Sequence, residues 1–116
     1  MKRDMELIRF LLQDIEGGLP KPDLSAYSED TQIYHLALLE EAGLIIAGIG
    51  TDEDGLLVSA SPVRLTWSGH EFLDAARNES AWRKIRSHLA KAGATVTISV
   101  LQDLLMACVK EQLRLS

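Results

Sequence analysis

The sequence has no second cysteine, no long hydrophobic run and no Lys or Arg between positions 22 and 63. Because Cys108 is the only cysteine, one chain cannot form a disulfide or a cysteine-based zinc site. No apolar run approaches the roughly 18 residues that span a bilayer. The N-terminus turns amphipathic without forming the apolar core of a signal peptide. We therefore expect a cytoplasmic protein with no membrane segment.

Charge is distributed unevenly along the chain. Residues 1–63 hold four Lys or Arg against twelve Asp or Glu, a net charge of −8. Residues 64–116 hold eight against five, a net charge of +3, so the whole chain carries −5. A chain divided in this way can associate head to tail or bind a partner of opposite sign. Solvated faces on different helices are the simpler explanation of the same pattern.

The length of 116 residues fits one domain. Hydrophobic and charged residues make up 47% and 25% of the chain, which is typical of soluble globular domains and excludes wholesale disorder. We expect a single domain over residues 1–116, with a core module at 1–77 and a C-terminal helical extension at 78–116.

The first part of the chain predicts two helices separated by a loop. Apolar residues recur at helical spacing over residues 4–16, and a Gly-Gly pair ends that pattern. Pro20 and Pro22 exclude a regular helix in the segment that follows. A second helix then begins after Ser28, which is a suitable N-cap, and ends at Gly43.

The rest of the chain predicts a β-hairpin and further helices. Apolar, strand-like runs at 44–49 and 56–60 flank a turn-rich acidic tip at 50–55. Three further helices are expected. The first runs from Trp67, capped by Thr66, to about Arg77, and the second from a cap at Asn78 or Ser80 to Gly93. The third follows Thr97.

This order of elements is typical of a winged-helix module. Residues 35–45, H-L-A-L-L-E-E-A-G-L-I, resemble the third helix and first wing strand of winged-helix repressors. The resemblance implies an α+β, mostly helical fold, with two helices and a hairpin wing followed by two to three C-terminal helices. The short helix that normally braces the DNA-reading helix is degenerate or missing, because the proline-containing loop occupies its place.

A narrower resemblance extends over nearly the whole chain. It rests on the opening M-K-R-D-M at 1–5, the block L-T-W-S-G-H-E-F-L-D-A-A-R-N at 65–78 and the tail at 93–105. These motifs resemble a family of small bacterial and phage proteins catalogued as a domain of unknown function. The resemblance implies the fold described above and brings no established activity.

The sequence offers no catalytic, cofactor or metal site. Ser68 and His70 are the nearest pairing of a nucleophile with a base, but Ser68 has an ordinary capping use at a helix start. None of the three histidines has a second metal ligand one helical turn away. The glycines of the first strand lack the Lys and Ser/Thr of a phosphate-binding loop. We therefore predict a non-enzymatic protein without cofactors.

The charges on the expected reading helix disfavour DNA binding by that helix. Affinity for duplex DNA comes mainly from Lys and Arg that neutralise phosphates. The second helix contains four carboxylates and no basic residue, and the hairpin tip adds Asp52, Glu53 and Asp54. The alternative hypothesis is a transcription regulator whose dimer presents a basic face from further along the chain to DNA. That face comprises Arg77, Arg83, Lys84, Arg86 and Lys91.

The preferred hypothesis is an adaptor that binds another, unidentified protein. Tyr34 and Leu38 would act as apolar anchors within a charged rim on the second helix, together with the acidic hairpin tip. The predicted partner-binding residues of that helix are Glu29, Asp30, Thr31, Gln32, Tyr34, His35, Leu38 and Glu41.

Two further apolar features concern packing. Trp67 and Trp82 have apolar neighbours at helical spacing, which predicts core or inter-helix contacts for both. The apolar stripe from Leu101 to Leu113 exceeds what a small winged-helix module needs. It can cover the first helix or a second chain, so a homodimer through the C-terminal helices is a further hypothesis.

Overall fold

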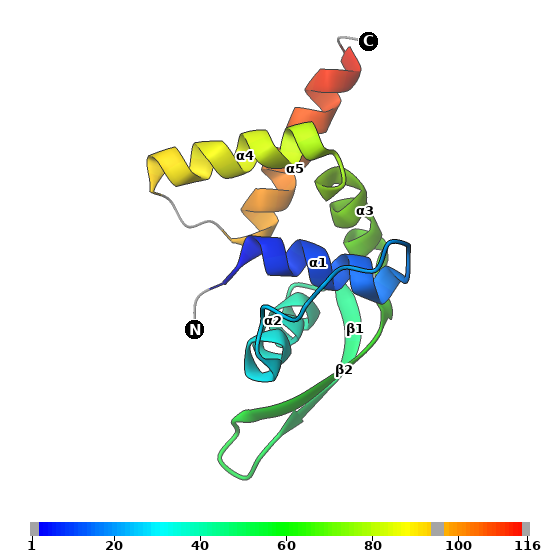
Figure 1. Ribbon diagram of the computed structural model, residues 1–116, viewed down its shortest axis with the longest axis vertical. Coiled ribbons are helices and arrows are strands. Elements are labelled where there is room, and N and C mark those ends of the chain that lie inside the picture. The colour runs from blue at the N-terminus through cyan, green and yellow to red at the C-terminus, as the bar shows by residue number, and fades with distance from the viewer. Residues whose placement is uncertain (1–2, 94–96, 115–116) are drawn as a thin grey trace. The chain divides into compact units, whose positions relative to one another are not determined.

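The computed structural model describes residues 3–93 and 97–114, so the first two residues of the opening motif lie outside the described residues. Within those ranges the chain forms five helices and one antiparallel pair of strands (Figure 1). The fold is α+β and mostly helical, with three helices after the hairpin, which confirms the predicted class. The winged-helix assignment stays a prediction. The elements are α1 (Met5–Glu16), α2 (Glu29–Glu41), β1 (Ile45–Thr51), β2 (Leu57–Leu65), α3 (Trp67–Ala76), α4 (Glu79–Ala92) and α5 (Ile98–Arg114).

The chain divides into two compact units, Met1–His70 and Glu71–Ser116, with the boundary inside α3. The first unit contains α1, α2 and the hairpin, and the second contains α4 and α5. The expected split of one domain into a core module at 1–77 and an extension at 78–116 stays a prediction.

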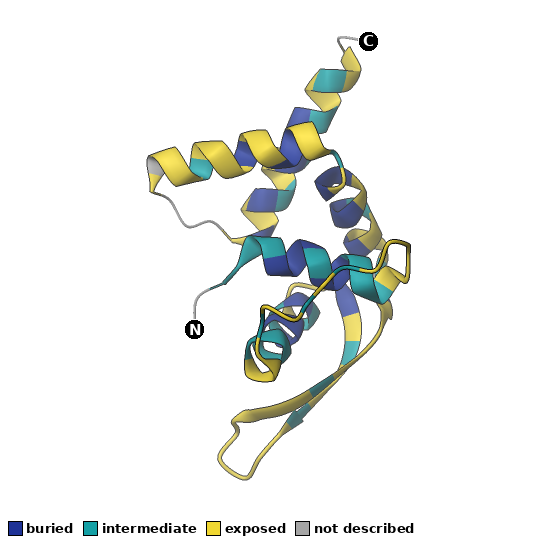
Figure 2. Cartoon of the chain, viewed as in Figure 1, coloured by how far each residue is buried: buried dark blue, intermediate teal, exposed yellow. Residues whose placement is uncertain are grey.

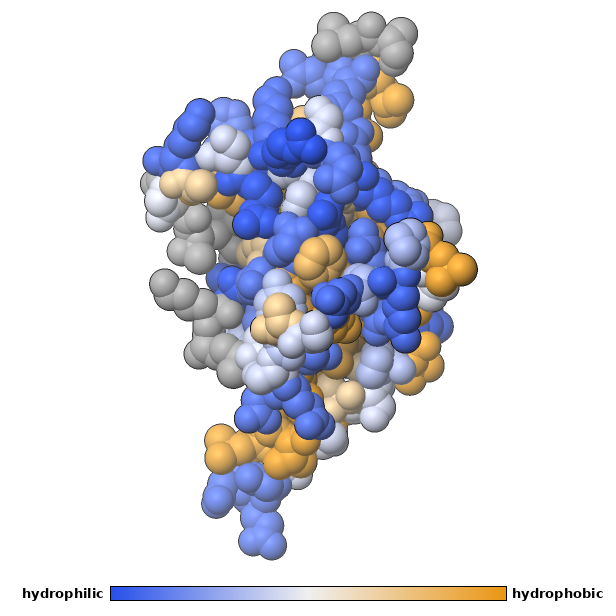
Figure 3. Space-filling model, viewed as in Figure 1, coloured by the Kyte–Doolittle hydropathy of each residue, from blue (hydrophilic) through white to orange (hydrophobic). Residues whose placement is uncertain are grey.

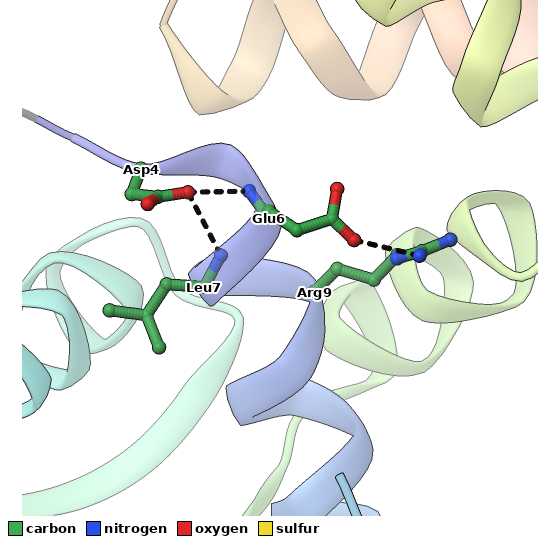
Figure 4. Close-up of polar contacts among 4 residues, drawn as sticks. All are labelled: Asp4, Glu6, Leu7 and Arg9. Atoms are coloured by element: carbon green, nitrogen blue, oxygen red, sulfur yellow. Dashed lines mark hydrogen bonds and ion pairs between the residues drawn. The ribbon is translucent and has the colours of Figure 1, made fainter. Parts of the chain in front are cut away.

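Local capping signals set the bounds of α1. The Asp4 carboxylate accepts hydrogen bonds from the backbone N–H of Glu6 (3.0 Å) and of Leu7 (3.2 Å), so it satisfies two donors that the first turn leaves unpaired (Figure 4). Glu6 also forms an ion pair with Arg9 at 2.7 Å. Gly17 ends the helix with a φ of +83°, a conformation that favours glycine. The predicted helix and its Gly stop are therefore confirmed.

No helix forms between α1 and α2 in the described chain, which confirms that the bracing helix is missing. The loop is instead held to α2 by Gln32, whose side-chain amide donates to the backbone carbonyl of Tyr27 at 3.1 Å. Ser28 caps α2 as predicted, because its hydroxyl accepts a hydrogen bond from the backbone N–H of Thr31 at 3.2 Å. Gly43 follows the end of the helix with a φ of +76°.

The hairpin is buried only at its base. Ile45 pairs with Leu65 and both side chains are in the core, whereas most of the hairpin beyond this pair is exposed (Figure 2). In the first unit the hairpin extends past α2, and its tip is the part farthest from α1 (Figure 1). A pair of strands therefore projects from the two helices that hold its base.

The second strand is longer than predicted. It runs to Leu65, past the expected end at Ala60, and includes Pro62, which pairs with Ala47. Proline is tolerated in an edge strand because its missing N–H can lie on the side without a neighbour. The register also shifts twice, so that Val58 and Val63 are extra residues on β2 while β1 stays continuous.

The turn from the hairpin into α3 explains the central glycine of the sequence motif. The backbone N–H of Thr66 donates to the carbonyl of Leu44 at 3.0 Å, and the Thr66 hydroxyl caps α3 by accepting from the N–H of Gly69 at 3.0 Å. A Cβ on Gly69 would overlap the carbonyl oxygen of Leu44. Only glycine allows the helix to approach the backbone this closely.

The two tryptophans have different environments. Trp82 is 3% exposed, which confirms its predicted packing, but Trp67 is 80% exposed, so the prediction of a packed Trp67 was wrong. The reason lies in the helix geometry. Gly69 is packed against the Leu44 backbone. Trp67 lies two residues before Gly69, which corresponds to about 200° around the helix, so the Trp67 side chain points away from that contact.

The second unit pairs α4 with α5. Asn78 caps α4 by accepting from the backbone N–H of Ala81 at 3.0 Å, and its side-chain amide donates to Gln112 of α5 at 2.6 Å. Gly93 ends α4 in the left-handed conformation. These bounds confirm the predicted cap and stop. The apolar stripe of α5 is buried in part, at Ile98, Leu101, Leu105 and Cys108.

Candidate functional site

The predicted acidic face of α2 is present in the first unit. Glu29 and Asp30 lie in the first turn, Glu41 is the last helical residue, and all three are exposed. The Ser28 cap places the first two carboxylates at the positive end of the helix dipole, where negative charge is stabilising. The dipole therefore stabilises Glu29 and Asp30, whereas Glu40 and Glu41 lie at its negative end and gain nothing from it.

Tyr34 and Leu38 lie one turn apart on α2 and are half-buried. The Tyr34 ring meets the ring of the neighbouring His35 edge to face, with centroids 5.4 Å apart and planes at 80°. This contact supports the Tyr34 side chain while leaving part of it accessible. Tyr34 and Leu38 thus lie between the acidic ends of the helix, and their role as anchors for a partner stays a prediction.

His35 is fully buried and belongs to the core of the first unit. Its Nε2 accepts a hydrogen bond from the backbone N–H of Asp4 at 2.8 Å, and its Nδ1 lies 2.8 Å from the carbonyl oxygen of Thr31, to which it donates. The side chain joins α2 to the start of α1. His35 therefore cannot contact a partner and leaves the candidate surface.

The polar groups of Thr31 and Gln32 already have partners within the first unit. The Thr31 hydroxyl lies 2.8 Å from the Ser28 hydroxyl at the helix cap. The Gln32 amide donates to backbone carbonyls of the loop, at 3.1 Å to Tyr27 and 3.4 Å to Leu24. Both residues are half-buried. They hold the start of α2 in place, and the surface that remains for a partner is formed by the carboxylates, Tyr34 and Leu38.

Asp52 organises the acidic hairpin tip. Its carboxylate accepts hydrogen bonds from the backbone N–H of Asp54 and of Leu56, both at 2.9 Å, and its own N–H donates to the Leu56 carbonyl at 2.9 Å. Gly55 has a φ of +81°, which this tight turn requires. Residues 51–55 of the tip are exposed, so three carboxylates are presented together on a well-defined turn.

The hairpin also carries an exposed apolar surface that the sequence interpretation missed. Orange residues gather next to the hydrophilic tip in the lower part of Figure 3. A two-stranded sheet has few neighbouring elements to cover its side chains. The predicted isolated hairpin was therefore the feature of the sequence from which this exposed surface could have been expected. The exposed large apolar residues of the hairpin are Ile46, Ile49, Leu56, Leu57, Val58 and Val63.

The basic residues of the alternative hypothesis lie on α4 and at the end of α3. The structure places all of them at the surface. Arg77 forms an ion pair with Asp74 at 3.9 Å, which neutralises part of its charge. Arg83 and Lys84 line a shallow hollow on α4 together with Glu79, Ser80 and Ser87. The exposed basic residues are Arg77, Arg83, Lys84, Arg86 and Lys91.

The two groups considered for catalysis lie close together in the sequence at the start of α3. Ser68 and His70 are both exposed on the first turn of α3. The described residues include no cluster of three or more His, Cys, Asp or Glu side chains that could hold a metal ion. Across the same residues, none of the helices combines the length and apolar character needed to cross a bilayer.

Comparisons with known proteins identify the relatives of the chain. A family model described as "Hypothetical protein (DUF2513)" matches residues 2–95. An uncharacterized protein of Haemophilus influenzae is 29% identical over 120 residues, which cover 97% of this chain and 99% of the relative. No solved structure matches the chain.

Proposed function

The chain belongs to the DUF2513 family of hypothetical proteins, and we propose that it acts as a non-catalytic adaptor that binds another protein. The observation that carries the proposal is the exposed apolar surface of the hairpin next to carboxylates that have no basic neighbours in the sequence from residue 22 to 63. Adjacent exposed apolar side chains with a polar rim are typical of protein interfaces.

The same surface disfavours nucleic acid. Glu29, Asp30 and Glu41 on α2, and the three carboxylates of the tip, would each repel phosphate. Thr31 and Gln32, which could read base edges, already hydrogen-bond to the cap and the loop. A protein with a basic rim and an apolar centre offsets these charges and covers Tyr34 and Leu38, so it fits the surface better than a duplex does.

Photo-crosslinking in cells tests the proposal. A benzophenone amino acid at position 38 should give a discrete protein adduct, because Leu38 lies within the proposed interface. The same amino acid at position 86 is the matched control, since Arg86 is also an exposed helical residue but lies in the second unit. Equal adducts at both positions, or none at position 38, would contradict the adaptor.

A transcription regulator is the second candidate, because five basic residues are exposed, one directly after α3 and four on α4. It requires binding to duplex DNA that weakens steeply as salt is added. The test is retention of a random duplex at about 50 mM salt and about 10 μM protein. This candidate is favoured if the wild type retains the duplex and the double variant Arg83→Glu with Lys84→Glu does not. No retention would favour the adaptor.

A homodimer through α5 is compatible with either candidate. Val100 and Leu104 are one turn apart on α5 and both are exposed, so an apolar strip on this helix is available to a second chain. Light scattering after size exclusion gives the mass in solution. A dimer that Leu104→Glu converts to a monomer supports the homodimer, and a monomeric wild type removes it.

A further inference from the structure

The backbone hydrogen bonds at the two ends of β1 show which of its groups face β2. The Leu44 carbonyl accepts from the N–H of Thr66 (3.0 Å), and the N–H of Asp52 donates to the Leu56 carbonyl (2.9 Å). Successive residues of an antiparallel strand direct their backbone groups to opposite edges. Even-numbered residues between 44 and 52 therefore face β2, and odd-numbered residues face away.

The outward edge of β1 has no neighbouring strand. Ala47, Ile49 and Thr51 direct their N–H and C=O groups to that edge, and the described chain contains only the β1–β2 pair as a sheet. Ile49 and Thr51 are exposed, so the distal part of the edge is accessible. Backbone groups on an open edge can pair with another extended chain.

The two edges of the hairpin are not equivalent. On β2, Pro62 has no N–H to donate, and the extra residues Val58 and Val63 interrupt the regular ladder. Natural proteins use such features to prevent strands from adding to an edge. β1 has none of them, because its sequence I-I-A-G-I-G-T is continuous, uncharged and free of proline. The open edge is therefore specifically that of β1.

Away from its base the hairpin has one apolar face and one small, polar face, whereas nearer the base the second face carries Ile46 paired with Arg64. Paired residues share a face, so Ile49 with Ala60 and Thr51 with Leu57 continue the face that begins at the buried pair Ile45 and Leu65. The opposite face carries Gly48 with Ser61 and Gly50 with Ser59. An added strand would place alternate side chains beside these two different faces.

Charge identifies the chemistry of the added strand. Residues 22–63 contain eight Asp or Glu and no Lys or Arg, and the tip carboxylates lie directly after β1. Long basic side chains can lie over the small Gly and Ser residues and approach the tip. A second copy of the hairpin would bring the same three tip carboxylates, and its one basic residue, Arg64, lies at the base far from the tip, so self-pairing is disfavoured.

We propose that β1 accepts, as a third strand, an extended segment of the partner protein in which basic and apolar residues alternate. The apolar residues would continue the face of Ile49 and Leu57, and the basic residues would lie on the Gly and Ser face. The inference rests on the proposed adaptor function and names the chemical class of its partner.

Amide hydrogen exchange with a synthetic peptide tests this inference. The probe is a peptide of about seven residues, a usual strand length, in which lysine alternates with valine. Its binding should slow exchange of the Ile49 and Thr51 amides by about tenfold or more at saturation, while the Gly48 and Gly50 amides, already bonded to β2, change little. A peptide with glutamate in place of lysine is the charge control, and one with a central proline is the strand control.

Two variants of one residue separate the backbone contact from the side chain. Ile49→Pro removes an outward N–H and leaves the bonds to β2 in place, so it should weaken peptide binding about tenfold relative to Ile49→Ala, which keeps the N–H. Unchanged chemical shifts in the rest of β1 and β2 would show that the hairpin remains formed. Equal affinities of the two folded variants, or no protection of the odd-numbered amides by the peptide, overturn the inference.

The crosslink at position 38 distinguishes a failure of the strand-addition inference from a failure of the adaptor proposal. If position 38 still crosslinks to a protein in the Ile49→Pro variant as in the wild type, the adaptor stands and strand addition is wrong. If position 38 gives no adduct in any variant, the adaptor itself fails. A crosslink at position 38 that Ile49→Pro abolishes and Ile49→Ala retains supports both.

Discussion

The backbone N–H of Asp4 donates a hydrogen bond to Nε2 of His35 at 2.8 Å, which joins the N-cap of α1 to the middle of α2. The other ring nitrogen, Nδ1, faces the Thr31 carbonyl, which can only accept, so Nδ1 must carry the proton. The neutral Nδ1–H form of His35 therefore satisfies both contacts. This bond helps to fix the helix that carries the proposed anchors.

Removal of the His35 side chain should destabilise the first unit. We expect His35→Ala to lower the free energy of unfolding by about 3 kcal/mol, because it leaves a cavity and an unpaired N–H at Asp4. Urea unfolding measures the change. His70→Ala is the control, since exposed His70 should cost less than about 0.5 kcal/mol. Equal effects of the two substitutions would remove the structural role assigned to His35.

The close approach of Gly69 to the Leu44 carbonyl predicts an asymmetry between glycines. Gly69→Ala should destabilise by about 2 kcal/mol or more, because the new methyl group would overlap backbone that has no room to move. Gly48→Ala should be nearly neutral, since a Cβ there meets nothing within 4 Å. Thermal unfolding compares the variants, and a Gly69→Ala protein as stable as the wild type would contradict the packing of this turn.

The two tryptophans should be distinguishable by fluorescence quenching. Trp67→Phe should remove most of the signal that acrylamide quenches, because the remaining Trp82 is buried. Trp82→Phe should leave an emission that is strongly quenched and shifted to longer wavelength, as expected for exposed indole. Similar quenching of both single-tryptophan variants would show that Trp67 is covered, either by the chain itself or by a second copy.

Asp23 gives a prediction about the loop that replaces the missing helix. Two hydrogen bonds from Ser25 hold the pKa of Asp23 below its usual value. The bond from the backbone N–H has the larger effect, and the bond from the hydroxyl has the smaller one. The depressed pKa means that the ionised carboxylate stabilises the loop above the unfolded pKa, and that this contribution is lost as pH falls through the folded pKa. NMR titration should show a partial return toward the usual pKa in Ser25→Ala, which keeps the N–H. No change in that variant would leave the hydroxyl without a role.

Helix bounds were predictable because their signals are local. Asp4, Ser28, Thr66 and Asn78 cap the helices that were expected after them, and each cap depends only on the next three residues. The place of the missing helix could be predicted for the same reason, since two prolines act on their own backbone.

Burial on the candidate surface could not be predicted in the same way. His35 lies between the half-buried Tyr34 and the buried Leu36, and its hydrogen bond to Asp4, 31 residues earlier in the sequence, is a contact that no local pattern indicates. The end of β2 was placed too early because Pro62 is unfavourable within a sheet but acceptable at an edge. The exposure of the hairpin likewise follows from the absence of a third strand in the described chain, not from the strands themselves.

The central claim is that carboxylates of the first unit attract a basic protein partner. Its most direct test is crosslinking at position 38 in a variant that combines Glu29→Gln with Glu41→Gln, compared with the matched pair Asp103→Asn with Glu111→Gln on α5. All four residues are exposed, so neither pair should disturb packing. We expect the first pair to reduce the protein adduct severalfold and the second to leave it unchanged. Equal adducts in both variants, or DNA in place of protein at position 38, would contradict the account.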